Sequence, residues 1–236
     1  VAAIVFAVEI FSLDLVFTSL VPLLLASVAA VITSYFFRGT DVLFSFELLD
    51  AWRVKDIIFY VFLGVATGIA SVYFSKMYFL ITRFFGWFSN AYVKIGIAAL
   101  AIGLMLYLFP PLYGEGYGLI NNLLNGKTEA ALSGIQYQID FNNIWMVIVI
   151  LLIIAVFKAI AMTTTFAAGG VGGIFIPTLF MGSALGNAVA KAINQFGFEV
   201  SEANFTLIGM TGLMAGVLHA PLTAIFLIAE ITGGYD

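Results

Sequence analysis

The chain contains 236 residues, of which 63% are hydrophobic and only 9% are charged, and its mean hydropathy is +1.12. Soluble domains carry about 25% charged residues on average, so a soluble globular fold of this length is excluded. Backbone in lipid must satisfy its own hydrogen bonds, and the long continuous apolar runs favour helices over a closed barrel. The composition therefore predicts an all-α membrane protein.

The charged and metal-binding residues exclude several kinds of partner. The net charge is −4 and no basic patch is present, so we expect no nucleic-acid partner. The chain has no cysteine and a single histidine, His219, which rules out a thiolate site or a histidine cluster for a metal. We also expect no cofactor.

The chain begins inside an apolar run, with no initiator methionine and no basic flank. Residues 1–10 are typical of the end of a helix that starts before Val1. A second apolar run, from Asp14 to Phe37, has the roughly 20 residues that a bilayer span needs and ends at Arg38-Gly39. We interpret the sequence as part of a longer protein.

A polar connector at 38–53 precedes a very long predicted helix, from Val54 to Phe88. At ~1.5 Å per residue this helix exceeds about 50 Å, so it must tilt or project from the membrane. A further span is predicted from Tyr92 to Phe109, where Pro110-Pro111 ends it.

The stretch 112–142 is the most polar, and it predicts one short amphipathic helix in GYGLINNLL followed by an aqueous loop. A span over 143–162 carries Lys158 near its end, where we expect the ammonium group to reach the interface. After a glycine run, a helix is predicted from Ile174 to Ile193.

Two short helices, 203–218 and 221–232, close the chain and are separated at His219-Ala220-Pro221. Neither is long enough to span a membrane alone, and His219 is predicted to be a polar cap at this break. Short apolar segments interrupted by Gly or Pro are typical of transporter binding sites near the membrane midplane.

An internal similarity suggests a repeat. The segment Ala2–Ile10, AAIVFAVEI, matches Thr223–Ile231, TAIFLIAEI, with Ala, Ile, Glu and Ile in register. Short apolar matches also arise by chance. If the match is real, the chain holds the end of one repeat and most of a second, the construction common in transporters.

The most informative local pattern is GGVGGIFIPTLFMGSALG, at 169–186. The glycines permit bare, extended backbone at membrane depth, which is tolerated where it lines a cavity. The helix that follows presents unpaired N–H groups and a positive dipole end, and Pro177 suits its first turn. Such a helix start can hold an anion without a basic side chain.

A structural alternative explains the same glycines by close helix packing. Gly182, Gly186 and Ala190 form a face of small residues that would let another helix approach. Since this face lies further along the helix than the N-terminal turn, the residues alone leave the anion site and the packing face equally open.

A family resemblance favours the anion site. GGIFIP resembles the GGIFAP signature of the CLC chloride channel and transporter family, and GMTGLMAGVLHAPLTAIFLIAEITGGY, GEGYGLI and VAAIVFAVEIF resemble other family segments in the same order. The resemblance implies that the backbone N–H groups of Ile174 and Phe175 face a central chloride. Gly172 and Gly173 would give access, Ile176 replaces the usual alanine, and Pro177 completes the signature.

The resemblance also implies an architecture of tilted and re-entrant helices in inverted repeats. The whole of 1–236 would be one partial transmembrane domain, with the end of the first repeat at 1–10 and most of the second at about 50–236, without its final helices. It further implies a homodimer through helices 14–37 and 221–232, a pore in each subunit, and a bacterial inner membrane as location.

Two acids, Glu9 and Glu230, each end an apolar run. They are either helix-end carboxylates that reach water or functional intramembrane acids on a proton pathway. In proton-coupled relatives the internal proton-transfer glutamate aligns with Ile10, which cannot titrate. We therefore expect a chloride channel, with a chloride/proton antiporter as the alternative.

Functions from two other classes fit the sequence less well. An intramembrane protease needs a serine–histidine pair or paired aspartates, and His219 has no serine motif beside it while the aspartates fall in loops or at ends. A membrane subunit that does not transport would have no need of bare glycine-rich backbone at membrane depth. Both are remote alternatives to anion transport.

Overall fold

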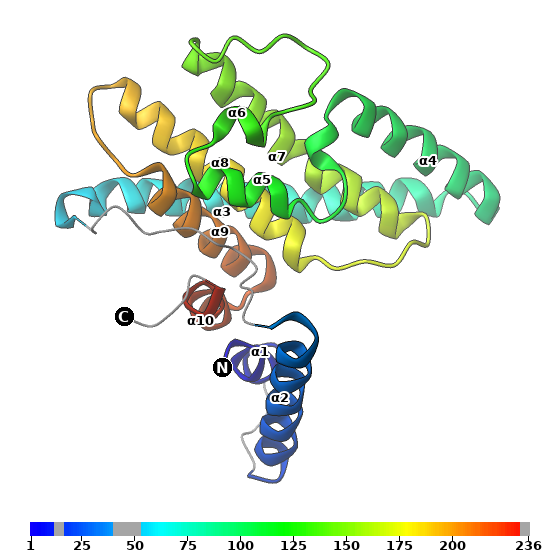
Figure 1. Cartoon of the computed structure of the whole chain (residues 1–236). Helices are drawn as coiled ribbons and strands as arrows, with labels where there is room; N and C mark the ends of the chain where they lie inside the picture. Colours follow the sequence, from blue (N-terminus) through cyan, green and yellow to red (C-terminus); the bar gives the residue numbers. More distant parts are fainter. Residues whose placement is uncertain (12–16, 40–52, 232–236) are drawn as a thin grey trace.

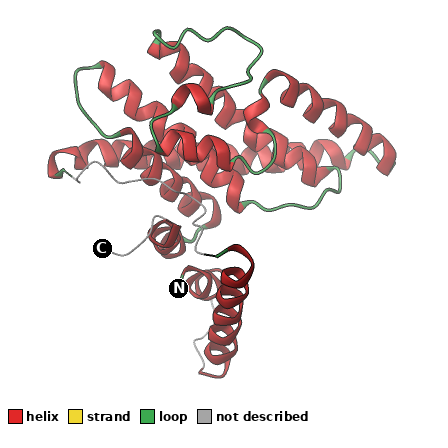
Figure 2. Cartoon of the chain, in the orientation of Figure 1, coloured by secondary structure: helices red, strands yellow, loops and turns green. Residues whose placement is uncertain are grey.

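The computed structural model describes residues 1–11, 17–39 and 53–231, and its regular structure in these ranges is helical (Figure 2). This confirms the predicted all-α class. Two short 3-10 turns, η1 (Val54–Asp56) and η2 (Pro110–Leu112), accompany the α-helices. The α-helices are α1 (Ala2–Phe11), α2 (Phe17–Arg38), α3 (Ile57–Gly86), α4 (Ala91–Leu108), α5 (Tyr117–Leu124), α6 (Thr128–Ala131), α7 (Ile144–Ala167), α8 (Phe175–Gln195), α9 (Glu202–Leu218) and α10 (Pro221–Ile231).

Among the described residues, three helical segments are long and apolar enough to cross a membrane: Val54–Gly86, Ala91–Leu108 and Ile144–Ala167. All three were predicted as spans. The described part of α2 begins at Phe17, so the predicted start at Asp14 and most of the connector at 38–53 lie outside the described residues. The break between the last two helices is also as predicted, with His219 as the exposed C-cap of α9 in left-handed conformation, φ 55°.

The helix α7 extends five residues beyond its predicted end at 162. The hydroxyls of Thr163 and Thr165 donate to carbonyl oxygens one turn earlier, at 2.8 and 2.9 Å. Because these polar side chains are satisfied within the helix, the threonine run continues α7 instead of ending it. The helix stops at Ala167, just before Gly169, whose φ of 96° is left-handed. Lys158 therefore lies well inside α7, not near its end.

The core forms where α8 packs between α7 and α9, while α3 crosses both α7 and α9 (Figure 1). The small-residue face of α8 makes the contact with α9. A Cβ atom at Gly182 would overlap the backbone of Gly209, and one at Gly186 would overlap the backbone of Phe205. The packing interpretation of these glycines is thus supported, and it concerns the middle of α8 rather than its beginning.

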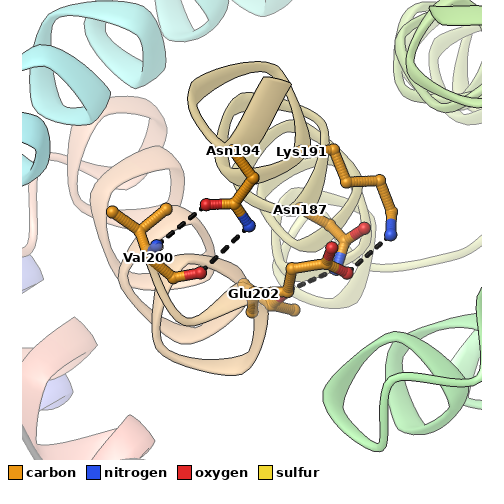
Figure 3. A network of polar contacts seen from close by, with 6 residues as sticks. Asn187, Lys191, Asn194, Val200 and Glu202 are labelled. Carbon is orange, nitrogen blue, oxygen red and sulfur yellow. Dashed lines mark hydrogen bonds and ion pairs between the residues drawn. The ribbon is translucent and has the colours of Figure 1, made fainter. Parts of the chain in front are cut away.

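A polar network joins the far end of α8 to the start of α9 (Figure 3). Asn194 exchanges two hydrogen bonds with the backbone of Val200, at 2.8 and 3.1 Å. Lys191 forms an ion pair with Glu202 at 2.6 Å, and the buried Asn187 donates to a threonine of α9. These bonds hold the two helices as a hairpin, so the direction of α8 is fixed from its C-terminal end.

Candidate functional site

The beginning of α8 has no side-chain cap. Its N-cap residue, Ile174, has helical φ and ψ and an apolar side chain. The first bond of the helical pattern runs from Thr178 N to Ile174 O at 3.2 Å. The N–H groups of Phe175 and Ile176 therefore have no acceptor within the helix, and Pro177 has no N–H to satisfy. The N–H of the N-cap residue Ile174 also precedes the first helical bond, so the predicted donors Ile174 and Phe175 are joined by Ile176 at the positive end of this 21-residue helix.

Three other long helices in the described chain, α4, α7 and α9, begin with a side-chain cap. Asn90 accepts from the backbone N–H of Tyr92 at the start of α4, and Asn143 accepts from Met146 at the start of α7. At the start of α9, Ser201 accepts from the backbone of its third residue. The longest helix, α3, also lacks a side-chain cap, but its first N–H, that of Ile57, donates to Val54 O of the preceding turn η1.

A cavity of about 490 Å³ opens at this helix start, and we call it the α8 cavity. Its walls come from α4, from η2 and the loop after it, from α7 and from the glycine segment. Of the six residues predicted to bind an anion, five line it: Gly172, Gly173, Phe175, Ile176 and Pro177. The sixth, Ile174, is half-buried and packs against the main hydrophobic core.

The glycine segment reaches the surface of the described structure along this cavity, with Val171 99% exposed. A Cβ atom at Gly172 would lie 2.9 Å from the ring of Phe166, which would have to move aside to make room for it. Gly173 has no atom within 4 Å of such a Cβ and a φ that other residues adopt. The segment thus leaves open space immediately in front of the α8 N–H groups.

Lys158 lines the same cavity, and the prediction that it reaches the interface is wrong. Its side chain is 4% exposed, and its ammonium group donates to Leu112 O at 3.1 Å and Gly114 O at 2.8 Å. It also lies 4.5 Å from the centre of the Phe180 ring. The turn η2 and the loop after it supply these carbonyl oxygens, so the charge is satisfied inside the protein.

Sequence reasoning missed this residue although a cue existed. A lysine within an apolar span is costly and therefore marks a functional or positioning group. With a helix end predicted at 162, Lys158 would lie in the last turn, where an interfacial ammonium group is expected. The exposed carboxylate of Glu115 lies on the wall of the same cavity, so the site combines one buried cation, one outer acid and backbone donors.

The two predicted acids, Glu9 and Glu230, lie outside the wall of the α8 cavity. The Glu9 carboxylate accepts three hydrogen bonds from the first residues of α10, and the contacts of Glu230 include a hydrogen bond from Ala2 N and an ion pair with the amino group of Val1. Neither interpretation offered for them from the sequence anticipated these contacts. Glu9, on α1, contacts α10, and Glu230, on α10, contacts α1. Neither acid lines the cavity at the start of α8.

In chemical terms, the site can hold a small anion by hydrogen bonding. The described residues contain no group of three or more His, Cys, Asp or Glu side chains that could hold a metal ion. The donors at the start of α8 are backbone N–H groups, which suit a chloride-sized ligand stripped of part of its water.

Comparison with known proteins agrees with this chemistry. A family model described as voltage gated chloride channel matches residues 1–236. The chain is 27% identical over 245 residues to a ClcB-like chloride channel protein of Ralstonia nicotianae, covering 100% of this chain and 52% of that protein. It is 26% identical to the voltage-gated ClC-type chloride channel ClcB of Salmonella typhimurium, covering 98% of this chain and 52% of that protein. The chain thus spans about half the length of the curated relatives it matches.

Proposed function

The chain belongs to the voltage gated chloride channel family, and from that premise we propose that the complete protein moves chloride and similar small anions across a membrane. The observation that carries the proposal is the uncapped start of α8 on the wall of a cavity, with the N–H groups of Phe175 and Ile176 free to donate. The relatives are named as channels, and we propose no enzymatic activity.

The chemistry of the α8 cavity suits an ion that must bind and then leave. Each hydrogen bond from a backbone N–H to a charged ligand contributes about 1.5–3 kcal/mol, and the helix dipole adds about 0.3–1 kcal/mol. These contributions offset part of the dehydration of a halide. The nearby cation, Lys158, already directs two of its three N–H donors to carbonyl oxygens of the protein, which limits its contact with the ion. Moderate binding of this kind permits rapid exit.

Within this family we propose a channel with weak or absent proton movement rather than a proton-coupled antiporter. A proton needs titratable groups or a water chain to cross a low-dielectric interior. Ile10 occupies the position at which the resemblance expects the internal carboxylate, and it cannot carry a proton. Two of the similar proteins, those of Salmonella typhimurium and Escherichia coli, are named as channels, which favours the same choice.

The proposed setting is a bacterial inner membrane, with the protein paired as a homodimer through α2 and α10. Large apolar side chains are exposed on both helices, including Leu25 and Phe36 on α2 and Leu222 and Ile225 on α10. Such faces suit lipid or another helix. Cysteines placed at Ile225 should crosslink two subunits, and a purely monomeric protein in liposomes would contradict the dimer.

The transport proposal is tested with the complete protein in liposomes. A chloride gradient should drive chloride efflux above that of empty vesicles, while a pH electrode outside records little proton movement. Absence of chloride flux would contradict anion transport. Uphill proton movement at a fixed ratio to chloride would instead establish the antiporter and show that Ile10 does not prevent coupling.

A further inference from the structure

The loop between η2 and α5 carries the one carboxylate found among the described residues that line the α8 cavity, that of Glu115. Its side chain is exposed, whereas Lys158 on the same wall is 4% exposed and lies inside the protein. A negative charge beside the proposed anion position opposes binding of the ion. The proposed function has so far made no use of this acid.

The loop is fixed on both sides of Glu115. Gly114 O accepts a hydrogen bond from the Lys158 ammonium group at 2.8 Å. On the other side, Gly116 has a left-handed φ of 90°, and a Cβ atom there would overlap the Phe180 ring. Phe180 is a fully buried residue of α8, and the Lys158 ammonium group lies over its ring. The backbone of Glu115 is therefore held against the helix whose start forms the candidate site.

The charges on the cavity wall oppose one another. Lys158 is the one cation among the described lining residues, and the positive end of α8 adds about half an elementary charge. Glu115 subtracts one charge from this sum. Because two N–H donors of Lys158 are bound to carbonyl oxygens, Lys158 acts on an ion mainly through its field. Without the acid, the wall would carry excess positive charge, which would bind an anion more tightly and release it more slowly.

We propose that Glu115 sets the anion affinity of the α8 cavity by opposing the fields of Lys158 and of the α8 start, so that the ion is held weakly enough to leave. This inference rests on the proposed function, because it assigns a role in binding the anion of that same site. The fixed backbone and the place on the cavity wall favour this electrostatic role over that of an acid that only solvates the loop.

The test is a charge series at residue 115 of the complete protein, with bromide affinity measured by titration calorimetry. Glu115→Gln should raise the affinity by roughly threefold to tenfold, the change expected when a partly screened like charge is removed. Glu115→Lys should raise the affinity further. Glu115→Asp keeps the charge and should stay within about twofold of wild-type protein.

Ionic strength separates an effect of charge from an effect of loop structure. The gain in Glu115→Gln should be larger at about 10 mM than at about 150 mM gluconate salt, because the Debye length falls from about 30 Å to about 8 Å. The melting temperature should change little, since the side chain is exposed. Glu129→Gln is the matched control, because Glu129 is an exposed acid on α6 away from the α8 cavity wall, and it should leave the affinity unchanged.

Three outcomes would contradict the proposal. Equal bromide affinity across the charge series, or a loss of affinity in Glu115→Gln, would overturn the role of Glu115 and leave the proposed function in place. A gain that does not depend on ionic strength would overturn it as well, because altered loop structure would then be the cause. If wild-type protein binds no bromide and moves no chloride, the proposed function fails and this inference fails with it.

Discussion

At the beginning of α10, the N–H groups of Leu222 and Thr223 donate to a carboxylate that arrives from α1. At the beginning of α8, the N–H groups of Phe175 and Ile176 face a cavity and no side chain caps them. Both helix starts offer the same backbone donors and the same positive dipole end. The difference is that one start is occupied by an anion that belongs to the protein.

The contrast supports the start of α8 as the place for a mobile anion. Because α3 and α5 also begin without a side-chain cap, the missing cap alone does not mark the site, and the position of the α8 start on the wall of the α8 cavity is the second observation. Other helix starts are occupied by a side-chain cap. Glu9 supplies this cap at α10, Asn143 at α7 and Ser201 at α9. The glycine segment ahead of α8 supplies none, and it leaves room for an ion.

The largest expected effect comes from making α8 resemble α10. Gly173→Asp places a carboxylate in the open space beside the first turn of α8, where no atom lies within 4 Å of a Cβ. Like charges about 4 Å apart repel by about 4 kcal/mol at an effective dielectric constant of 20. Halide affinity, measured by titration calorimetry, should fall on the order of a hundredfold or more.

Gly173→Asn is the control, because it has nearly the same shape without the charge. It should weaken binding far less than Gly173→Asp. Equal affinity in the aspartate variant and wild-type protein would show that the ion does not bind at the start of α8.

The second prediction concerns the loop that walls the α8 cavity. Lys158→Met removes the charged donor from the carbonyl oxygens of Leu112 and Gly114. Loss of a hydrogen bond from a charged group costs about 1.5–3 kcal/mol, so thermal unfolding in detergent should occur at a lower temperature. Lys158→Arg keeps the charge and should lose less stability. A methionine variant as stable as wild-type protein would contradict the positioning role of Lys158.

The third prediction separates binding from packing along α8. Gly186→Ala forces a methyl group into the backbone of α9 and should reduce stability by about 1–3 kcal/mol. Halide affinity should stay unchanged, since Gly186 lies in the middle of the helix. Gly103→Ala in α4, where a Cβ has open space, is the control and should not destabilise the protein. A fall in affinity with Gly186→Ala would show that packing and binding are not separable.

The smallest effect is expected where a neutral side chain provides the cap. Ser201→Ala removes the acceptor for the N–H of Asn204 at the start of α9. Caps of this kind contribute about 1 kcal/mol, so the melting temperature should fall slightly. The affinity for halide should not change. New halide binding at α9 in this variant would extend the comparison, and unchanged stability would contradict the capping role of Ser201.

Much of the fold was predictable because its elements follow local rules. Continuous apolar runs predicted the spans α3, α4 and α7, and Pro110 and His219 marked real helix ends. The predicted end of α7 was wrong because threonines can remain in a helix when their hydroxyls donate to backbone carbonyl oxygens one turn earlier.

The candidate site was predictable only in part. The glycine segment and the start of α8 are contiguous in sequence, so a local pattern together with the family resemblance indicated them. The carbonyl oxygens that hold Lys158 come from a loop 44 and 46 residues away. The acids Glu9 and Glu230 bind helices more than 200 residues away. Contacts between such distant residues depend on tertiary packing, which local patterns do not reveal.

The central claim is that the protein holds a mobile anion at the start of α8 and none at the capped start of α10. The direct measurement is anomalous scattering from crystals of the complete protein soaked in bromide. The account predicts a bromide peak against the N–H groups of Phe175 and Ile176 and no peak at Leu222 or Thr223. Bromide elsewhere in the membrane region, with none at the start of α8, would contradict it.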